Sequence, residues 1–230
     1  MRARLDRVRS RLRYLGPRRT ALRSVYMAAN ELMVLQIYEC IKLTLEDVTP
    51  ESRSRPSAYR CRFLSRPELE RLSGDPTNRL SRGFLESAWA KGDECIAFLD
   101  GDELASFCWY SRRPKVILGL LRLHFDPAWT YMYRGYTKPA YRGQRLHSMG
   151  LVEAVRIYTE RGRKGLVAIV EAVNFESKRS VYGMGWQKFG VVYHLGLGRR
   201  SLVWHTGRCD QYDFFFEKLE RSSRTGGSSV

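Results

Sequence analysis

One short stretch in the second half of the chain combines residue types that bind phosphate groups. A turn containing Pro139 leads into Arg142-Gly143-Gln144-Arg145, directly before a helical pattern that begins at Leu146. The first N–H groups of a helix lack intrahelical partners, and the helix dipole there favours negative charge. Gly143 lets the backbone approach a phosphate closely, and the arginines add charge and donors. The stretch predicts an anion site, with a joint carrying solvated arginines as the alternative.

Two residues near this loop could transfer protons. Glu171 follows the apolar run Gly165–Val170, which is expected to form a strand. His147 stands at the start of the helix, where the cationic loop should lower its proton affinity and keep it neutral. Either side chain could serve as a general base. The alternatives are a solvated carboxylate at a strand end and a histidine that only lines the loop.

The region that must position these residues, 81–219, alternates strand and helix patterns, which predicts a mixed α/β fold. Asp100-Gly101-Asp102 is a turn signal between two apolar runs, so a hairpin is expected there. The expected helices are Phe84–Lys91, Leu146–Arg161 and Ser177–Tyr182, and the expected strands are Glu94–Leu99, Leu104–Tyr110, Thr130–Thr137, Gly165–Val170, Gln187–Tyr193 and Ser201–His205.

This order of elements, with its loop, resembles the GNAT superfamily of N-acyltransferases. The coenzyme loop of that family reads Arg/Gln-x-x-Gly-x-Gly/Ala and usually follows Pro-x-Tyr-Arg-Gly; here the chain reads Pro139-Ala140-Tyr141-Arg142-Gly143-Gln144-Arg145-Leu146-His147. Arg145 and His147 replace the two later small residues of the pattern. An Asn, a small residue three positions on and a Gly–aromatic pair also match, as Asn174, Ser177 and Gly185-Trp186. The resemblance covers roughly residues 84–193.

The resemblance implies a central, mostly antiparallel sheet with a splayed strand pair, flanked by helices and preceded here by an N-terminal amphipathic helical segment. It implies acyl-CoA as co-substrate, bound between the strand ending near Thr137 and the strand ending near Val170. Backbone N–H groups near Tyr136 would polarise the thioester oxygen. The residues implied to bind the coenzyme are Tyr136, Thr137, Arg142, Gly143, Gln144, Arg145, Leu146, His147, Asn174 and Ser177.

The implied reaction is direct attack of a neutral amine on the thioester, with Glu171 or His147 as base. The family often uses a tyrosine as acid toward the departing thiolate, at the position of Val181 in this chain. Tyr182, one residue later, is the nearest candidate for that role. No metal is expected, because His124, His194 and His205 are isolated and show no ligand spacing.

The charge balance and the first 48 residues favour anionic partners. Lys and Arg number 40 against 24 acids, a formal charge of +16. Residues 1–48 read as a basic amphipathic helical segment, with alternating arginines from Arg2 to Arg13 and apolar residues at helical spacing from Leu22 to Ile41. Three interpretations remain open: packing on the core or on a second subunit as a homodimer, an interfacial helix on an anionic membrane, or, less favoured, a nucleic-acid arm.

Charged residues interrupt the N-terminal apolar stretch, so a membrane span is not expected. No signal-peptide pattern is present, and the five cysteines are scattered without a CxxC pair. We therefore expect a cytoplasmic protein with reduced thiols. In the interfacial-helix interpretation, this protein would be peripheral on the inner face of the membrane. The expected organisation is the helical segment 1–48, a connector with short elements at 49–80, an acyltransferase domain at 81–219 and a disordered tail at 220–230.

The acceptor amine is less specified. The apolar run Val116–Leu121 and the aromatic residues after it, Phe125 to Tyr133, predict either core or a tunnel for a long acyl chain or lipid acceptor. With the basic N-terminus, the tunnel interpretation predicts acylation of a lipid amine, such as a sphingoid base, at a membrane surface. The alternatives are an acetyltransferase acting on charged tRNA and a non-catalytic acyl-CoA-binding protein.

Overall fold

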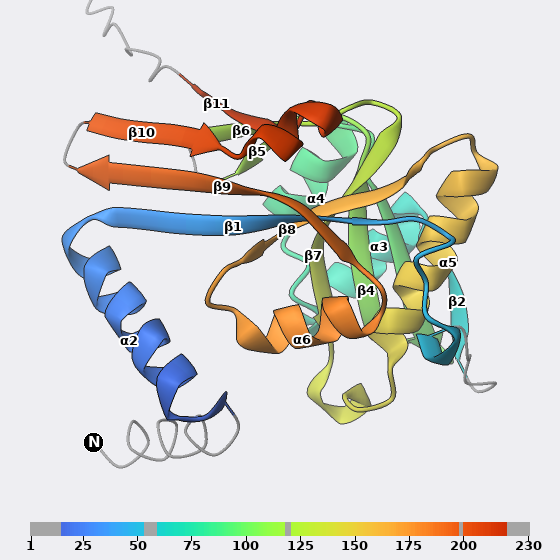
Figure 1. Ribbon diagram of the computed structural model, residues 1–230. Helices are drawn as coiled ribbons and strands as arrows, with labels where there is room; N and C mark the ends of the chain where they lie inside the picture. The colour runs from blue at the N-terminus through green and yellow to red at the C-terminus, as the bar shows by residue number, and fades with distance from the viewer. Residues whose placement is uncertain (1–14, 53–58, 118–120, 198–199, 220–230) are drawn as a thin grey trace, which may run out of the picture.

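The chain is built around one large sheet. The computed structural model describes residues 15–52, 59–117, 121–197 and 200–219, so the arginine-rich start and the predicted tail at 220–230 lie outside the described residues. Eight strands follow the order β10-β9-β1-β8-β7-β4-β3-β2 (Figure 1). They are β1 (Val34–Leu43), β2 (Arg60–Phe63), β3 (Glu94–Asp100), β4 (Glu103–Ser111), β7 (Trp129–Thr137), β8 (Gly165–Glu171), β9 (Gln187–Leu197) and β10 (Arg200–His205).

A smaller sheet and five described α-helices surround the large sheet. The small sheet has the order β11-β6-β5, with β5 (Lys115–Ile117), β6 (Leu121–His124) and β11 (Phe215–Lys218). The helices are α2 (Pro17–Leu32), α3 (Arg66–Ser73), α4 (Arg82–Ala90), α5 (Leu146–Glu160) and α6 (Phe175–Gly183). Short 3-10 turns occupy Pro50–Ser52, Pro76–Asn78, Pro139–Tyr141 and Gly207–Tyr212.

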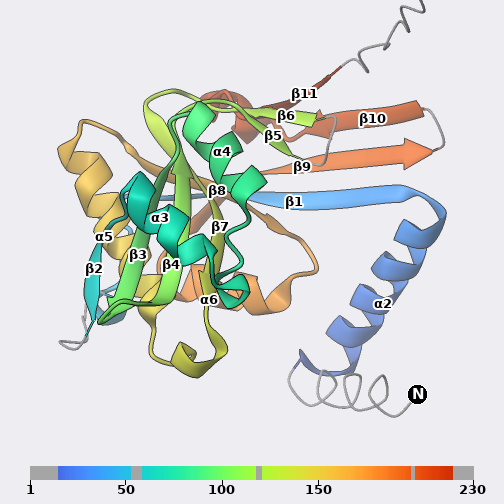
Figure 2. The ribbon, with the colours of Figure 1, turned by 180° about the vertical axis from the view of Figure 1, so that it is seen from behind.

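Both faces of the large sheet are covered over β3, β4 and β8, which explains why these strands read as nearly continuous apolar runs. On one face, α5 and α6 pack on side chains such as Ile96, Tyr110 and Ala168. On the other face, α3 and α4 cover β3 and β4, as Figure 2 shows, through residues such as Trp109. The small sheet covers the β1, β8 and β9 part of that same face.

The fold class expected from the sequence is confirmed. The sheet is mixed α/β, and every neighbouring pair of its strands is antiparallel except β7 and β8. The predicted hairpin is β3–β4, and the predicted helices of region 81–219 are α4, α5 and α6, with ends that differ by one or two residues from the expected ones.

The predicted continuation of the N-terminal helix to Ile41 is wrong. The helix ends at Leu32, and β1 then enters the centre of the sheet between β8 and β9 (Figure 1). Gln36, Glu39 and Lys42 recur at steps of three, which imitates the polar face of a helix. A strand buried on both sides lacks strict alternation, and Glu39 is stabilised there by the ammonium groups of Lys178 and Lys188.

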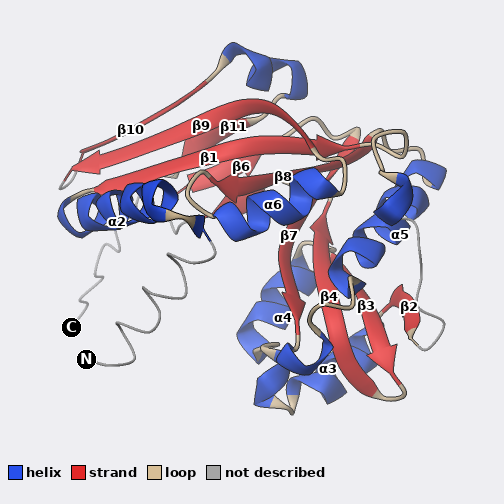
Figure 3. Ribbon diagram, turned by 60° about the horizontal axis from the view of Figure 1, so that its bottom comes forward, coloured by secondary structure: helices blue, strands red, loops and turns tan. Residues whose placement is uncertain are grey.

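The turn from α2 into β1 is closed by side chains that form hydrogen bonds to the backbone. The Asn30 amide donates to the carbonyl of Leu35 and accepts from the N–H of Leu35. The Tyr26 hydroxyl accepts from the N–H of Ile37 at 3.2 Å. These bonds hold α2 along the part of β1 that extends past the end of β8, beside α6 (Figure 3).

The apolar run near Val116 belongs to the small sheet. Leu121 and Leu123 of β6 are buried between the two sheets, as the core interpretation predicts, and residues 118–120 lie outside the described part. None of the described helices has both the length and the apolar composition that crossing a membrane requires.

Gly185, after α6, provides a test of how tightly the connection to β1 is packed. Its φ is +103°, and a Cβ at this position would lie 1.8 Å from the carbonyl oxygen of Asp47. We expect Gly185→Ala to lower the free energy of unfolding by at least about 2 kcal/mol, because both the backbone angle and the space exclude a side chain. The measurement is urea denaturation followed by circular dichroism.

Gly183→Ala is the matched control. No atom lies within 4 Å of a Cβ added there. Its unfolding midpoint should stay close to that of the wild type, and equal midpoints for the two variants would contradict the packing described at Gly185.

Candidate active site

A cleft opens where the only parallel pair in the described sheet separates. β7 and β8 are paired from Trp129–Gly165 to Tyr131–Val167. Beyond these residues they no longer pair with each other, while β7 stays paired with β4 and β8 with β1. The gap forms a cleft of about 370 Å³. Its lining comes from β1, β7, β8, α5, α6 and the turn before α6: Ile41, Tyr131, Met132, Tyr133, Arg134, Gly135, His147, Ala168, Ile169, Val170, Glu171, Asn174, Ser177, Ser180 and Val181.

A β-bulge in β7 shapes one wall of the cleft. The register with β4 passes from Trp109–Tyr133 to Phe107–Tyr136, so Arg134 and Gly135 together oppose Cys108. Arg134 has a φ of +49°, and its guanidinium lies over the Phe84 ring, 3.8 Å from the ring centre. Bulges bend a strand and change the direction of its side chains, and they occur often beside active sites.

His147 packs against this bulge. Its Nδ1 lies 3.2 Å from the Sγ of Cys108, and its Cε1 would be 2.4 Å from a Cβ added to Gly135, so only glycine at 135 leaves room for the ring. Burial lowers the pKa of His147 to about 4. The cause of the lowered pKa is burial, whereas the sequence-based prediction attributed it to the cationic loop.

Glu171 ends β8 between two tyrosines. Tyr38 of β1 lies directly opposite it across the sheet register. The Tyr26 hydroxyl binds the N–H of Ile37, whose carbonyl accepts from the residue after Glu171, Ala172. Burial raises the pKa of Tyr26 and Tyr38, and the charge of Glu171 raises both further. The carboxylate thus faces the cleft beside two protonated phenols.

A second, polar hollow adjoins the cleft at the N-terminus of α5. Its volume is about 430 Å³, and it shares Ser180 with the cleft. Arg145 is the N-cap of α5 with a φ of +59°, and no side chain caps the helix. The lining residues are Ser52, Arg145, Ser148, Glu176, Arg179, Ser180, Gly183 and Met184. Uncapped helix N–H groups, two arginines and several hydroxyls form a donor set suited to an anion.

The structure brings together some of the predicted coenzyme residues and separates others. Gly143 has a positive φ of +82°, a conformation that favours glycine. Of the Arg142–Arg145 loop, however, only Arg145 lines the polar hollow. Arg142 donates to the carbonyl of Thr137, and Gln144 accepts from the Tyr59 hydroxyl. The Asn174 side chain accepts from the N–H of Ser177 and caps α6 within the cleft lining.

The remaining predicted residues lie around the cleft rather than in its lining. Leu146 is buried in the core, the Tyr136 ring lies under the guanidinium of Arg79, and Thr137 exchanges a hydrogen bond with Ser106. The Tyr182 hydroxyl donates to Glu39. Val181, the position that the family pattern indicates for the acid, does line the cleft.

Sequence reasoning missed the contribution of α6 to the polar hollow. Arg179 and Ser180 follow Ser177 on the helix, and their positions on one side of α6 were a usable signal. Tyr26 could not be placed, because its neighbour β1 was expected to be helical. Gly135 inside a strand pattern was a usable signal for the bulge. Cys108 could be placed on a strand, but its contact with His147 depends on how α5 packs on the sheet.

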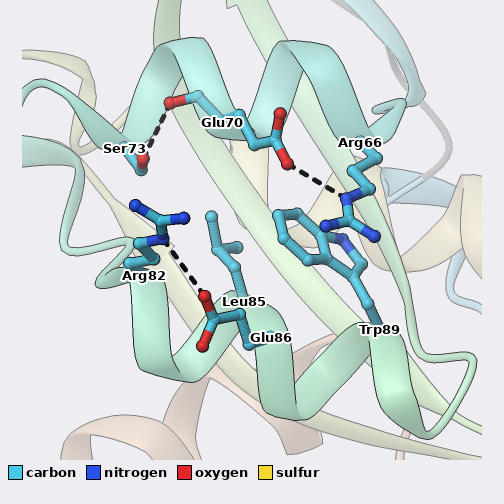
Figure 4. A pocket seen from close by; sticks show the side chains of 7 residues that line it. All are labelled: Arg66, Glu70, Ser73, Arg82, Leu85, Glu86 and Trp89. Atoms are coloured by element: carbon cyan, nitrogen blue, oxygen red, sulfur yellow. Dashed lines mark hydrogen bonds and ion pairs between the residues drawn. The ribbon is translucent and has the colours of Figure 1, made fainter.

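A third hollow, between α3 and α4, shows no comparable chemistry. Figure 4 shows Arg66 and Arg82 on its two walls, each paired with a glutamate of its own helix, Glu70 and Glu86. Trp89 lies under the guanidinium of Arg66, 4.3 Å from the ring centre. Both arginines are engaged within their helices, across a groove of about 290 Å³ that lies away from the cleft between β7 and β8.

Comparisons with known proteins show likeness in the fold. No family model and no curated protein matches the sequence. A Drosophila protein structure aligns with 77% of this chain and 57% of its own length, with 16% identity and a TM-score of 0.50. A GCN5-related N-acetyltransferase-like protein from Streptococcus suis aligns with 76% and 66%, with 11% identity and a TM-score of 0.49.

An aminoglycoside N-acetyltransferase solved with CoA aligns with 56% of this chain and 92% of its own, with 15% identity and a TM-score of 0.44. The chain spans less than two thirds of the length of the Drosophila and Streptococcus structures. At these identities the likeness concerns the fold alone. That fold is a mostly antiparallel sheet whose one described parallel pair separates, the arrangement that the sequence resemblance implies.

Proposed function

We propose that this protein is an acyl-CoA-dependent N-acyltransferase. The observation that carries the proposal is the cleft between β7 and β8, which adjoins an anion-binding hollow at a helix N-terminus. A CoA thioester has a pyrophosphate at one end and a reactive carbonyl at the other. The two adjoining hollows match these two ends: the polar hollow with its arginines suits the pyrophosphate, and the cleft, lined largely by strands, suits the carbonyl.

The polar hollow would hold the pyrophosphate. The N–H groups of the first turn of α5 lack a side-chain cap, and Arg145 and Arg179 lie on its walls. Ser148 and Ser180 add hydroxyl groups to the same walls. The fit supports acyl-CoA as a co-substrate, because charge-assisted bonds from arginine and a helix N-terminus are the strong contacts for phosphate oxygens.

The cleft would hold the thioester and the attacking amine. Attack by the amine nitrogen forms a C–N bond at the acyl carbon, and the C–S bond breaks to release the CoA thiol. Negative charge develops on the carbonyl oxygen, and the bulge at Arg134 and Gly135 presents backbone to that position. The amine must also lose a proton to the protein or to solvent.

Glu171 is the proposed acceptor of that proton. It faces the cleft at the end of β8, whereas His147 binds Cys108 through Nδ1 and has a pKa of about 4. A group with so low a pKa is a weak base at neutral pH. The acid role predicted for Tyr182 would require its hydroxyl to leave Glu39.

The acceptor is proposed to be a lipid amine at an anionic membrane surface. α2 lies beside α6 at the cleft, since Arg23 pairs with Glu176 and Arg19 lies over Phe175. Its opposite face is apolar and uncovered: Val25 is 68% exposed and Leu32 84%. The sequence before α2 carries six arginines between Arg2 and Arg13. An exposed apolar face next to such a charge complements an anionic bilayer.

Coenzyme binding tests the polar hollow. We expect Arg145→Ala and Arg179→Ala each to weaken acetyl-CoA binding by roughly 10-fold or more, since each removes a charged donor near the proposed pyrophosphate. The measurement is isothermal titration calorimetry with acetyl-CoA and palmitoyl-CoA. Arg82→Ala, at the groove on α4, is the control and should bind as the wild type does. Absence of binding to the wild-type protein would refute the proposed function.

The base is tested by Glu171→Gln. We expect kcat for thiol release from acyl-CoA, measured over a panel of primary amines, to fall by about 10²-fold or more, because an amide cannot accept the amine proton. Binding of acetyl-CoA should be unchanged. Glu160→Gln, on the exposed end of α5, is the control for loss of a carboxylate. Equal rates for Glu171→Gln and the wild type would exclude Glu171 as base.

The membrane surface is tested by flotation with liposomes containing phosphatidylserine. Deletion of residues 1–48 would also remove β1, so we choose point substitutions. We expect Val25→Gln to lower the bound fraction several-fold, because about 1 kcal/mol or more of apolar burial is lost. Ser24→Gln, exposed and adjacent on α2, is the matched control. Equal flotation of the two variants would overturn the membrane assignment. So would sedimentation that shows a dimer of the wild type which Val25→Gln dissociates, because the apolar face of α2 would then be covered by a second copy.

A further inference from the structure

We infer that His147 donates a hydrogen bond from its Nε2–H to the thioester carbonyl oxygen, and that Cys108 is the positioning residue that sets this tautomer. The inference rests on the proposed function and adds a side-chain donor to the backbone of the bulge. It also gives the histidine a role other than that of base. Three observations carry it: the sulfur contact, the fit against Gly135 and the position of the ring in the cleft lining.

The sulfur contact selects the tautomer. Cys108 is buried, and burial raises the pKa of its thiol to about 12, so the sulfur keeps its proton at neutral pH. A thiol donates weakly and accepts weakly, whereas an unprotonated imidazole nitrogen is a good acceptor. The favourable arrangement across the 3.2 Å contact is therefore S–H to Nδ1. A neutral imidazole carries one proton, which must then reside on Nε2.

The ring is fixed in place by its surroundings. On α5, the neighbouring residue Leu146 packs in the same core cluster as Phe98, and Gly150, three positions after the histidine, lies close to the Phe98 ring. On the other side, the Nδ1 and Cε1 atoms would lie 3.0 and 2.4 Å from a Cβ at residue 135. The ring therefore rests directly on the backbone of the bulge. A donor held in this way needs little reorganisation when charge develops on a nearby oxygen.

The electrostatic setting favours a donor over a base. The nitrogen that could accept a proton, Nδ1, faces Cys108 rather than a substrate. Because the ring stays neutral across the physiological range, its N–H strength does not change with pH there. Loss of one such donor from an oxyanion site typically lowers kcat by about 10²- to 10³-fold.

The tautomer can be measured without any turnover. Protein labelled with 15N-histidine is examined by two-dimensional long-range 1H–15N NMR at pH 7, comparing the wild type with Cys108→Ser and Cys108→Ala. We expect the Nε2–H tautomer for His147 in the wild type. Serine keeps an X–H donor and should preserve that tautomer, whereas alanine should give a mixture. An Nδ1–H tautomer or a charged ring in the wild type would overturn the inference.

Contact with the carbonyl is read from bound substrate. The C=O stretch of [1-13C]acetyl-CoA is recorded by infrared difference spectroscopy in the wild type and in His147→Phe, after circular dichroism has established that the variant folds. We expect a shift to higher frequency in the variant, with kcat for thiol release about 10²-fold lower and binding of acetyl-CoA nearly unchanged. An unchanged stretch would refute the donor role, whereas failure of acetyl-CoA to bind the wild type would refute the proposed function and leave the tautomer result standing.

Discussion

The end of pairing between β7 and β8 is the constraint on which the rest of the molecule depends. Parallel strands that stay paired leave no space between them, and here the ladder stops after Tyr131–Val167 while both strands run on. The divergence exposes strand backbone and side chains to a cleft in the middle of an otherwise closed sheet. The helices that follow the two strands then reach the same opening, α5 with its N-terminal turn and α6 along its length. Binding groups and reacting groups are thus assembled from the ends of two neighbouring strands.

The bulge in β7 and the burial of His147 depend on that geometry. On the bulged backbone a side chain at residue 135 would collide with the ring of His147, and the glycine avoids that collision. Cys108 lies opposite the bulge on the face of β4 that packs against α5, and there its sulfur contacts the imidazole of His147. Burial then sets the charge state of both groups, with the thiol and the imidazole each kept neutral.

Sequence patterns were sufficient for the elements whose periodicity was clear. The turn at Gly101 predicted the hairpin, and the helical patterns after Arg145 and over Ser177–Tyr182 predicted α5 and α6, because local turn chemistry and periodicity specify them. β1 was not predictable in this way: Glu39 is a charged residue inside the sheet, and its partners Lys178 and Lys188 come from distant elements. The same limit applies to the site, where Glu171 and His147 could be named but the contributions of Tyr26 and Cys108 depend on tertiary placement.

The position of β1 has a consequence for how the chain folds. Glu39 and Lys178 are 139 positions apart in the sequence, and the strand that carries Glu39 lies between β8 and β9. During synthesis β1 emerges before β8 and β9, and it has neither sheet partner until those later strands have been made. Until then the apolar side chains of β1 lack their native neighbours. The long segment between β1 and β8 must also form a closed loop before these two strands can pair. Assembly of the cleft should be a late folding event, and chaperone dependence should be greatest in the period before β1 pairs with β8.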